Sequence, residues 1–221
     1  MNAPPTPALA ARLAPPVTLA LQIAVLTTGA LRLAQDWTNP FVWWSVGTTV
    51  LALVVLQAVR LLLPDLFARR AVKLEDARYQ RFRTFFPWLI GADAALLGMF
   101  TLLLLLAPPD VSGMLTPGVL FTLLIAWAAS LYASYGTYLS LARAFLQPDQ
   151  AVAHVTLREW LLRSIIASVV LTVMSVNEEI RTGQAEQTLM VVKLGVTVVA
   201  AALELTLFFL IRRAVRDHAR A

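Results

Sequence analysis

Six long apolar runs constrain this chain more than any other feature of its sequence. They cover residues 17–33, 41–63, 85–107, 118–141, 160–176 and 188–211. A helix needs about 17–25 mainly apolar residues to cross a hydrocarbon core that is about 30 Å thick. Because lipid offers the backbone no hydrogen-bond partner, each run is expected to fold as a helix. The sequence therefore predicts an all-α, polytopic membrane bundle of six transmembrane helices.

Composition agrees with lipid as the natural solvent. Hydrophobic residues make up 59% of the 221 residues and charged residues only 14%, whereas a soluble domain carries roughly a quarter charged residues. The net charge of +5 is compatible with nucleic-acid binding. In a membrane protein the same excess indicates basic loops that face anionic lipid. We therefore predict a lipid bilayer with an anionic inner leaflet as partner, and no nucleic acid.

The positions of the basic residues predict an orientation. With the N-terminus in the cytoplasm, all of the 18 Lys and Arg except Arg32, Arg181 and Lys193 fall on the cytoplasmic side, as the positive-inside rule requires. One helix more or fewer would move every later loop to the wrong side. We expect three helical hairpins in a single transmembrane domain (residues 1–221), with both termini cytoplasmic, in an inner or plasma membrane.

Residues 64–84, between the second and third runs, form a basic cytoplasmic segment. Its cations, which we predict to contact lipid, are Arg69, Arg70, Lys73, Arg78, Arg81 and Arg83. Apolar side chains are interspersed among them, so the segment read as a helix is basic and amphipathic and suited to an anionic leaflet. A simpler interpretation is a charged loop that only sets orientation.

Two carboxylates lie inside the predicted spans. Asp93 in the third and Glu204 in the sixth both fall roughly 10–12 Å from the cytoplasmic edge of the hydrocarbon, at 1.5 Å per helical residue. Insertion scales put Asp at the centre of a helix at about 3 kcal/mol. Each acid therefore requires a partner, a proton or water.

Other polar residues recur along the predicted helices at the spacing of one helical turn. In the fifth run a stripe of hydroxyl side chains consists of Ser164, Ser168, Thr172 and Ser175. In the fourth run a second stripe consists of Ser130, Ser134 and Thr137. In a functional interpretation these stripes line a cavity that is open to the cytoplasm. Asp93 and Glu204 then bind a cation or a proton there, and the assisting side chains are Gln22, Gln57, Arg60, Tyr135 and Ser168.

A structural interpretation competes with the functional one. Small residues such as Gly91, Ala95 and Gly98 let helices approach closely, and the acids form buried ion pairs. The pairs in question are Asp93 with Arg60 and Glu204 with Arg163. Tryptophans fit an aromatic belt, with Trp37, Trp43 and Trp44 at the outer interface and Trp88 and Trp160 at the inner one.

Missing residue types exclude several chemistries. The chain has no cysteine, and its two histidines, His154 and His218, lie outside the apolar runs. Disulfides, iron–sulfur clusters and haem held by intramembrane histidines are therefore excluded. A serine protease in the membrane needs a base of the histidine type, which no span contains. We predict no cofactor, no metal site and no assigned catalytic residue.

Three function classes remain. The leading hypothesis is a transporter, channel or substrate-binding transport subunit for a small polar or cationic solute, with Asp93 and Glu204 as the binding pair. The second is a non-transporting subunit, scaffold or sensor that contacts anionic lipid or a cytoplasmic partner, as part of a complex or a homo-oligomer. The third is an intramembrane enzyme that uses the two carboxyls as acid and base.

Overall fold

In a computed structural model the chain forms long helices joined by short links. The structure describes residues 6–35, 37–38, 40–106, 117–148, 150–182 and 187–218. These ranges contain six helices and no strand: α1 (Thr6–Gln35), α2 (Pro40–Phe67), α3 (Ala77–Leu106), α5 (Pro117–Leu146), α6 (Ala151–Thr182) and α7 (Gln187–His218). Each helix contains most or all of one predicted apolar run. The all-α class and the number of helices are confirmed.

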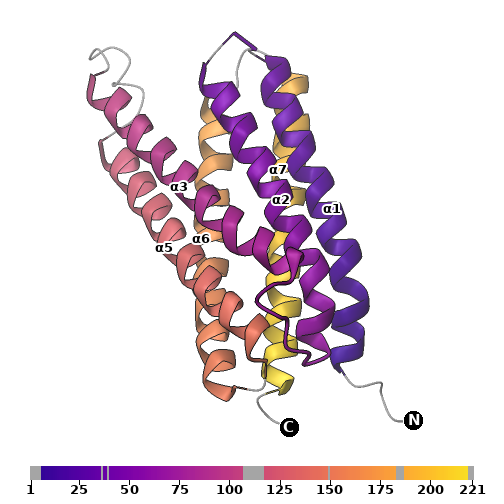
Figure 1. Ribbon diagram of the computed structural model, residues 1–221. Coiled ribbons are helices and arrows are strands. Elements are labelled where there is room, and N and C mark those ends of the chain that lie inside the picture. Colours follow the sequence, from indigo (N-terminus) through magenta and orange to yellow (C-terminus); the bar gives the residue numbers. More distant parts are fainter. Residues whose placement is uncertain are drawn as a thin grey trace.

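The helices pack as a closed ring. In the order α1, α2, α3, α5, α6, α7 each packs against the next, α7 returns to α1, and α2 also touches α5. Two helices therefore lie between α3 and α7, whichever way the ring is followed. Figure 1 shows the start of α1 and the end of α7 at the same lower end, while α3 and α5 lean away from α1 and α2 toward the upper end.

The tightest packing lies where the helices converge at the lower end. The core there includes the fully buried side chains of Leu62, Leu63, Phe82, Phe145 and Leu157. The Phe82 ring lies edge-on to Phe145 at a centroid distance of 5.5 Å. A dense interior therefore holds this end of α2, α3, α5 and α6 together.

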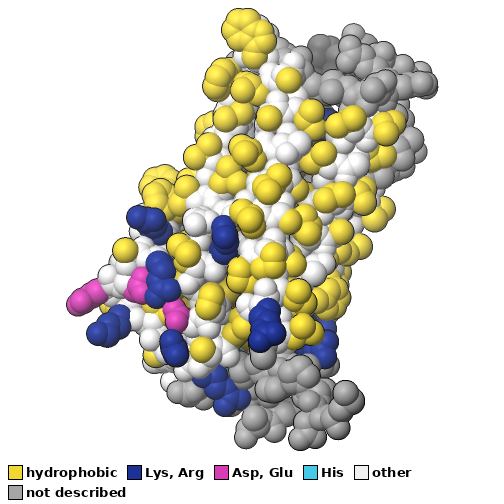
Figure 2. Space-filling view, turned by 90° about the vertical axis from the view of Figure 1, so that its right-hand side faces the viewer, with side chains coloured by type: hydrophobic (Ala, Val, Ile, Leu, Met, Phe, Trp, Pro, Cys, Tyr) yellow, Lys and Arg dark blue, Asp and Glu magenta, His cyan; other side chains and the backbone are white. Residues whose placement is uncertain are grey.

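Four helices are long and apolar enough to cross a membrane within the described residues. The stretches are Leu9–Ala34, Val42–Phe67, Ala77–Leu102 and Val191–Val215, in α1, α2, α3 and α7. Helices α5 and α6 are of similar length, 30 and 32 residues, but carry the hydroxyl stripes. On the face shown in Figure 2, apolar side chains cover the upper part, and Lys and Arg gather in the lower part.

Three prolines at the edges of the apolar runs lie inside helices and not at helix ends. Pro15 and Pro16, which directly precede the first apolar run, lie inside α1, and Pro64, which directly follows the second, lies inside α2. A proline removes one backbone N–H. In membrane helices neighbouring side chains and local adjustments compensate for that loss. Helices α1 and α2 therefore extend past these prolines, beyond the apolar runs.

The basic segment at 64–84 is not one amphipathic helix. It consists of the last turn of α2, a link at 68–76 and the first turns of α3. Helix α2 ends in a Schellman motif: the N–H of Arg70 donates to the carbonyl of Asp65 at 2.8 Å, and that of Arg69 to Leu66 at 3.2 Å. Val72 is buried, and its N–H donates to the carbonyl of Phe145 at 2.9 Å. These contacts tie the link to the end of the bundle.

Arg69 occupies the position in this motif that usually holds glycine. Its φ is 54°, a left-handed conformation that costs an L-residue about 1–2 kcal/mol. Glycine adopts it without strain but loses about 0.5–1 kcal/mol more backbone entropy. We expect Arg69→Gly to raise the free energy of unfolding by about 0.5 kcal/mol, measured by thermal unfolding in detergent. Arg70→Gly, the control, is expected to bring no gain, and an equal gain there would contradict this account.

Close approach of helices depends on glycines other than those predicted. Nothing lies within 4 Å of a Cβ placed on Gly91 or Gly98, so the prediction that these residues let helices pack closely is wrong. A Cβ on Gly136 would instead lie 2.2 Å from the Trp160 ring, and one on Gly29 would lie 2.9 Å from the Thr49 methyl. Sequence spacing cannot show which helix face meets a neighbour.

Four of the five belt tryptophans have exposed side chains. Trp37, Trp43, Trp44 and Trp88 are exposed, as contact with an interface requires. Trp160 differs because its ring lies against Gly136 of α5. Its role is to pack α6 on α5.

Candidate solute-binding cavity

A cavity of about 250 Å³ lies between α5, α6 and α7. Seven of the nine described residues that line it are polar, and these nine are Ser130, Ser134, Ser164, Ser168, Leu171, Thr172, Thr197, Glu204 and Phe208. The two predicted hydroxyl stripes thus face each other across this space, with α7 as the third wall.

Helical periodicity explains why these residues meet. Residues four apart lie on one face of a helix, so Ser164, Ser168 and Thr172 project from α6 in successive turns. On α7, Thr197 and Glu204 are seven residues apart and share one face. Packing α5, α6 and α7 side by side then collects hydroxyls around a single carboxylate.

Glu204 is held by a hydroxyl and not by a cation. The Oγ of Ser168 donates to Oε2 of Glu204 at 3.0 Å. Within the described residues Glu204 forms no ion pair. Arg163, the alternative partner, is exposed, and its guanidinium carbon lies 4.5 Å from the centroid of the Trp160 ring. The predicted Glu204–Arg163 ion pair is therefore wrong.

A second hydroxyl contact ties α5 to α6. Thr137 Oγ1 and Ser164 Oγ are 2.8 Å apart, and both residues are buried. Ser164 also lines the cavity. The stripe on α6 thus serves packing and cavity lining at once, so the two interpretations of it do not exclude each other.

Asp93 does not line this cavity. It lies half-buried on α3, across the ring from α7, and none of the cavity-lining residues comes from α3. Within the described part of the chain Asp93 and Arg60 form no ion pair with each other, so the alternative Asp93–Arg60 pair is also wrong. The shared depth of Asp93 and Glu204 therefore does not put them in one pocket, and solute binding at Asp93 stays a prediction.

The other predicted assisting residues also lie away from the cavity. Gln22 Nε2 donates to Oε1 of Gln57 at 3.1 Å, which joins α1 to α2. Tyr135 is 48% exposed, with its ring centroid 6.4 Å from that of Tyr138. Of the predicted binding residues only Ser168 and Glu204 line the cavity.

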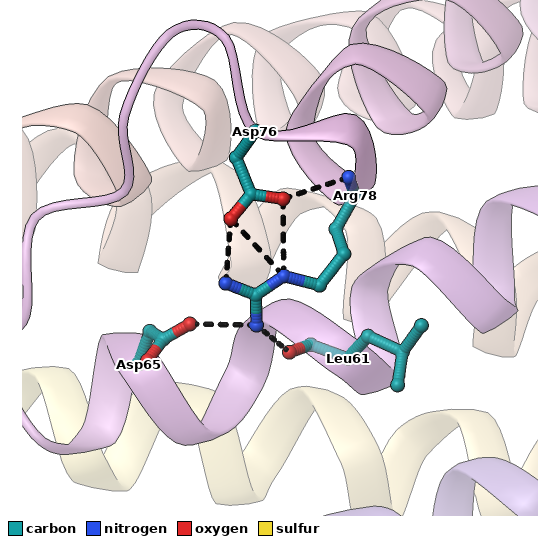
Figure 3. Close-up of polar contacts among 4 residues, drawn as sticks. All are labelled: Leu61, Asp65, Asp76 and Arg78. Atoms are coloured by element: carbon teal, nitrogen blue, oxygen red, sulfur yellow. Dashed lines mark hydrogen bonds and ion pairs between the residues drawn. The ribbon is translucent and has the colours of Figure 1, made fainter.

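Arg78 forms a polar clasp between α2 and α3, which we define as Arg78 with Asp65, Asp76 and the Leu61 carbonyl (Figure 3). Its guanidinium reaches Asp76 at 2.6 Å, Asp65 at 2.9 Å and the Leu61 carbonyl at 2.9 Å. The Asp76 carboxylate also accepts the backbone N–H of Arg78 at 2.8 Å, so it caps the N-terminus of α3.

Sequence reasoning assigned Arg78 to lipid contact and missed its acidic partners. An aspartate directly before a helix is an N-cap signal that could have shown the role of Asp76. Hydrogen bonding from Arg78 lowers the pKa of Asp76 below its ordinary value of 3.8. The other cations of the segment, Arg69, Arg70, Lys73, Arg81 and Arg83, are exposed.

The arrangement limits what the cavity can bind. Within the described residues no group of three or more His, Cys, Asp or Glu is placed to hold a metal ion. What remains is one carboxylate surrounded by hydroxyl donors and acceptors. Such a set binds a small polar molecule or a cation by hydrogen bonds and charge.

The helices and their exposed apolar side chains define the class: this chain is an all-helical integral membrane protein. Comparison of the chain with models of known protein families, with curated proteins and with solved structures gives no match in any of the three.

Proposed function

We propose that this protein binds and moves a small polar or cationic solute through the cavity at Glu204, as a transporter, a channel or a substrate-binding transport subunit. The observation that supports this most is the hydroxyl-lined cavity around a carboxylate that no arginine or lysine neutralises within the described residues. An intramembrane carboxylate is costly and most often belongs to a substrate or ion pathway. Packing of helices alone needs no acid.

The proposed orientation places the basic lower end in the cytoplasm of an inner or plasma membrane. Helices α1 and α2, α3 and α5, and α6 and α7 pack as sequence neighbours, which supports three hairpins. Exposed Arg and Lys at 69–83 support an inward-facing basic end by the positive-inside rule. The proposed site consists of Glu204 and Ser168, and Asp93, Gln22, Gln57, Arg60 and Tyr135 lie outside it.

Flux through reconstituted protein tests this proposal. Losing a hydrogen bond to a charged group costs about 1.5–3 kcal/mol, which corresponds to about a 10- to 150-fold loss of affinity. We expect Glu204→Gln to lower uptake by about that factor and Ser168→Ala by about tenfold. Uptake of radiolabelled ethanolamine, alanine and glycerol into proteoliposomes provides cationic, zwitterionic and neutral probes.

Thr206→Ala is the matched control for the flux experiment. Thr206 lies two residues from Glu204, but it is exposed, and its hydroxyl donates to the carbonyl of Ala202 in its own helix at 2.7 Å. Uptake by this variant is expected to equal that of the wild type. Wild-type uptake by both Glu204→Gln and Ser168→Ala would contradict the proposal.

A non-transporting subunit or sensor is the second candidate, supported by the basic end of the bundle. Three exposed cations, Arg69, Arg70 and Lys73, sit on the link that Val72 ties to α5, and two more, Arg81 and Arg83, sit on the first turns of α3. Together they present an ordered surface to anionic lipid or to a cytoplasmic protein. This role predicts that Glu204→Gln lowers the unfolding temperature and that purification retains a partner. An acid/base enzyme needs a second acid near Glu204, and the described residues of the cavity lining include none.

A further inference from the structure

We infer that the cavity at Glu204 selects a small organic ammonium ion, a primary amine with a short carbon chain. This inference rests on the proposed function and names the class of solute. It is drawn from the charge of the cavity, from its hydrogen-bonding groups, from its size and from its apolar wall.

The charge of the cavity favours a cation. Among the described lining residues Glu204 is the only one with a charged side chain, and in that same part of the chain it accepts a single hydrogen bond, from Ser168. A carboxylate offers about four acceptor positions, so most of its capacity remains for a ligand. An anion would meet this carboxylate with no cation to offset the repulsion, because none of the lining residues that the structure describes is Lys, Arg or His.

The donor set favours an ammonium ion over a metal ion. Calcium takes about 6–8 oxygen ligands, commonly from several carboxylates, whereas this cavity has one. Transition metals prefer imidazole or thiolate ligands, and neither is present among the lining residues. An ammonium group has three N–H donors, which match the Glu204 carboxylate and the oxygens of nearby hydroxyls such as Thr197 and Ser134.

Size and shape favour a carbon skeleton behind the charge. A water molecule takes about 30 Å³ in the liquid, so the cavity of about 250 Å³ has room for about eight water-sized groups. A bare alkali ion would leave most of that space to water. Leu171 and Phe208 supply an apolar side against which methylene groups lose their contact with water, and an aromatic ring also attracts a nearby cation.

A matched trio of probes tests the inference directly. 5-Aminopentan-1-ol, pentane-1,5-diol and 5-hydroxypentanoate share a chain length and differ in charge. Binding to the purified full-length protein in nanodiscs is measured by calorimetry at constant ionic strength. We expect the amine to bind at least tenfold more tightly than the diol, and 5-hydroxypentanoate to bind more weakly than the diol. Glu204→Gln is expected to abolish the preference for the amine, and Thr206→Ala to retain it.

The outcomes separate this inference from the transport proposal. Equal binding of the three probes, no binding of the amine, or a preference that survives in Glu204→Gln would overturn the ammonium inference, even where Glu204→Gln abolishes flux of alanine or glycerol. Tight, Glu204-dependent binding of the amine supports the inference. If the amine binds in this way but no probe is taken up into proteoliposomes, the transport proposal is contradicted and the proposed binding site remains supported.

Discussion

Replacing Gly136 by alanine is expected to lower the free energy of unfolding by about 2–3 kcal/mol, the upper part of the range for overpacked interiors. The Cβ of alanine would lie 2.2 Å from Cδ2 and Cε3 of the Trp160 ring, far inside van der Waals contact. Either the ring must move or α5 and α6 must separate. Thermal or denaturant unfolding in detergent micelles measures the loss.

Two further side chains contact the Trp160 ring, so moving it has a cost. Tyr132 packs edge-on against Trp160 with centroids 5.1 Å apart, and Arg163 lies over the same ring. Shifting Trp160 therefore disturbs both contacts. Combining Gly136→Ala with Trp160→Leu is expected to recover part of the stability, because the smaller side chain leaves room for the new methyl group.

Gly91→Ala and Gly98→Ala are the controls for this prediction. Nothing lies within 4 Å of the added Cβ at either position, and alanine favours a helix over glycine by about 1 kcal/mol. Both variants are expected to be as stable as the wild type or slightly more so. A loss at Gly136 no larger than at these two positions would show that Trp160 does not pack against this glycine.

Replacing Arg78 by methionine is expected to lower the free energy of unfolding by about 2 kcal/mol. The change leaves Asp65, Asp76 and the Leu61 carbonyl without the guanidinium they share. Breaking a fully buried ion pair costs about 3–5 kcal/mol. The loss is smaller here because the Arg78 side chain is 38% exposed and those of Asp65 and Asp76 are 21% and 23% exposed.

Acid should weaken the same contact in the wild type. The pKa of Asp76 is lowered by its hydrogen bonds with Arg78, so it is lower in the folded protein than in the unfolded chain. The resulting stability is fully present above the ordinary pKa of 3.8 and is lost as the pH falls through the folded value. Arg78→Met is expected to lose less stability than the wild type between about pH 6 and pH 3.

Arg81→Met is the control for the clasp. Arg81 lies three residues along α3, is exposed and forms no ion pair within the described residues. Its replacement is expected to change stability by no more than about 0.5 kcal/mol. Equal losses at positions 78 and 81, or an unchanged acid response in Arg78→Met, would mean that the clasp does not stabilise the link between α2 and α3.

The cavity shows how far residue patterns predict a site. The hydroxyl stripes at Ser130 and Ser134 and at Ser164 and Ser168 were predictable, because spacing of four places residues on one helix face. That Glu204 joins them and Asp93 does not was not predictable, because equal depth in a membrane says nothing about which helices are neighbours. The same reason explains why Gly136 could not be distinguished from Gly91.

The sequence by itself determined that the helices lie in lipid, and it determined how many helices there are. The length and apolarity of a run decide whether it can cross the bilayer with all its backbone hydrogen bonds made. The tertiary structure decided the rest: the ring order that separates α3 from α7, the glycine that meets Trp160, and the partners of Arg78. These depend on which surfaces touch, and contact between helices is set by the packing of side chains over the whole bundle. No single segment carries that information.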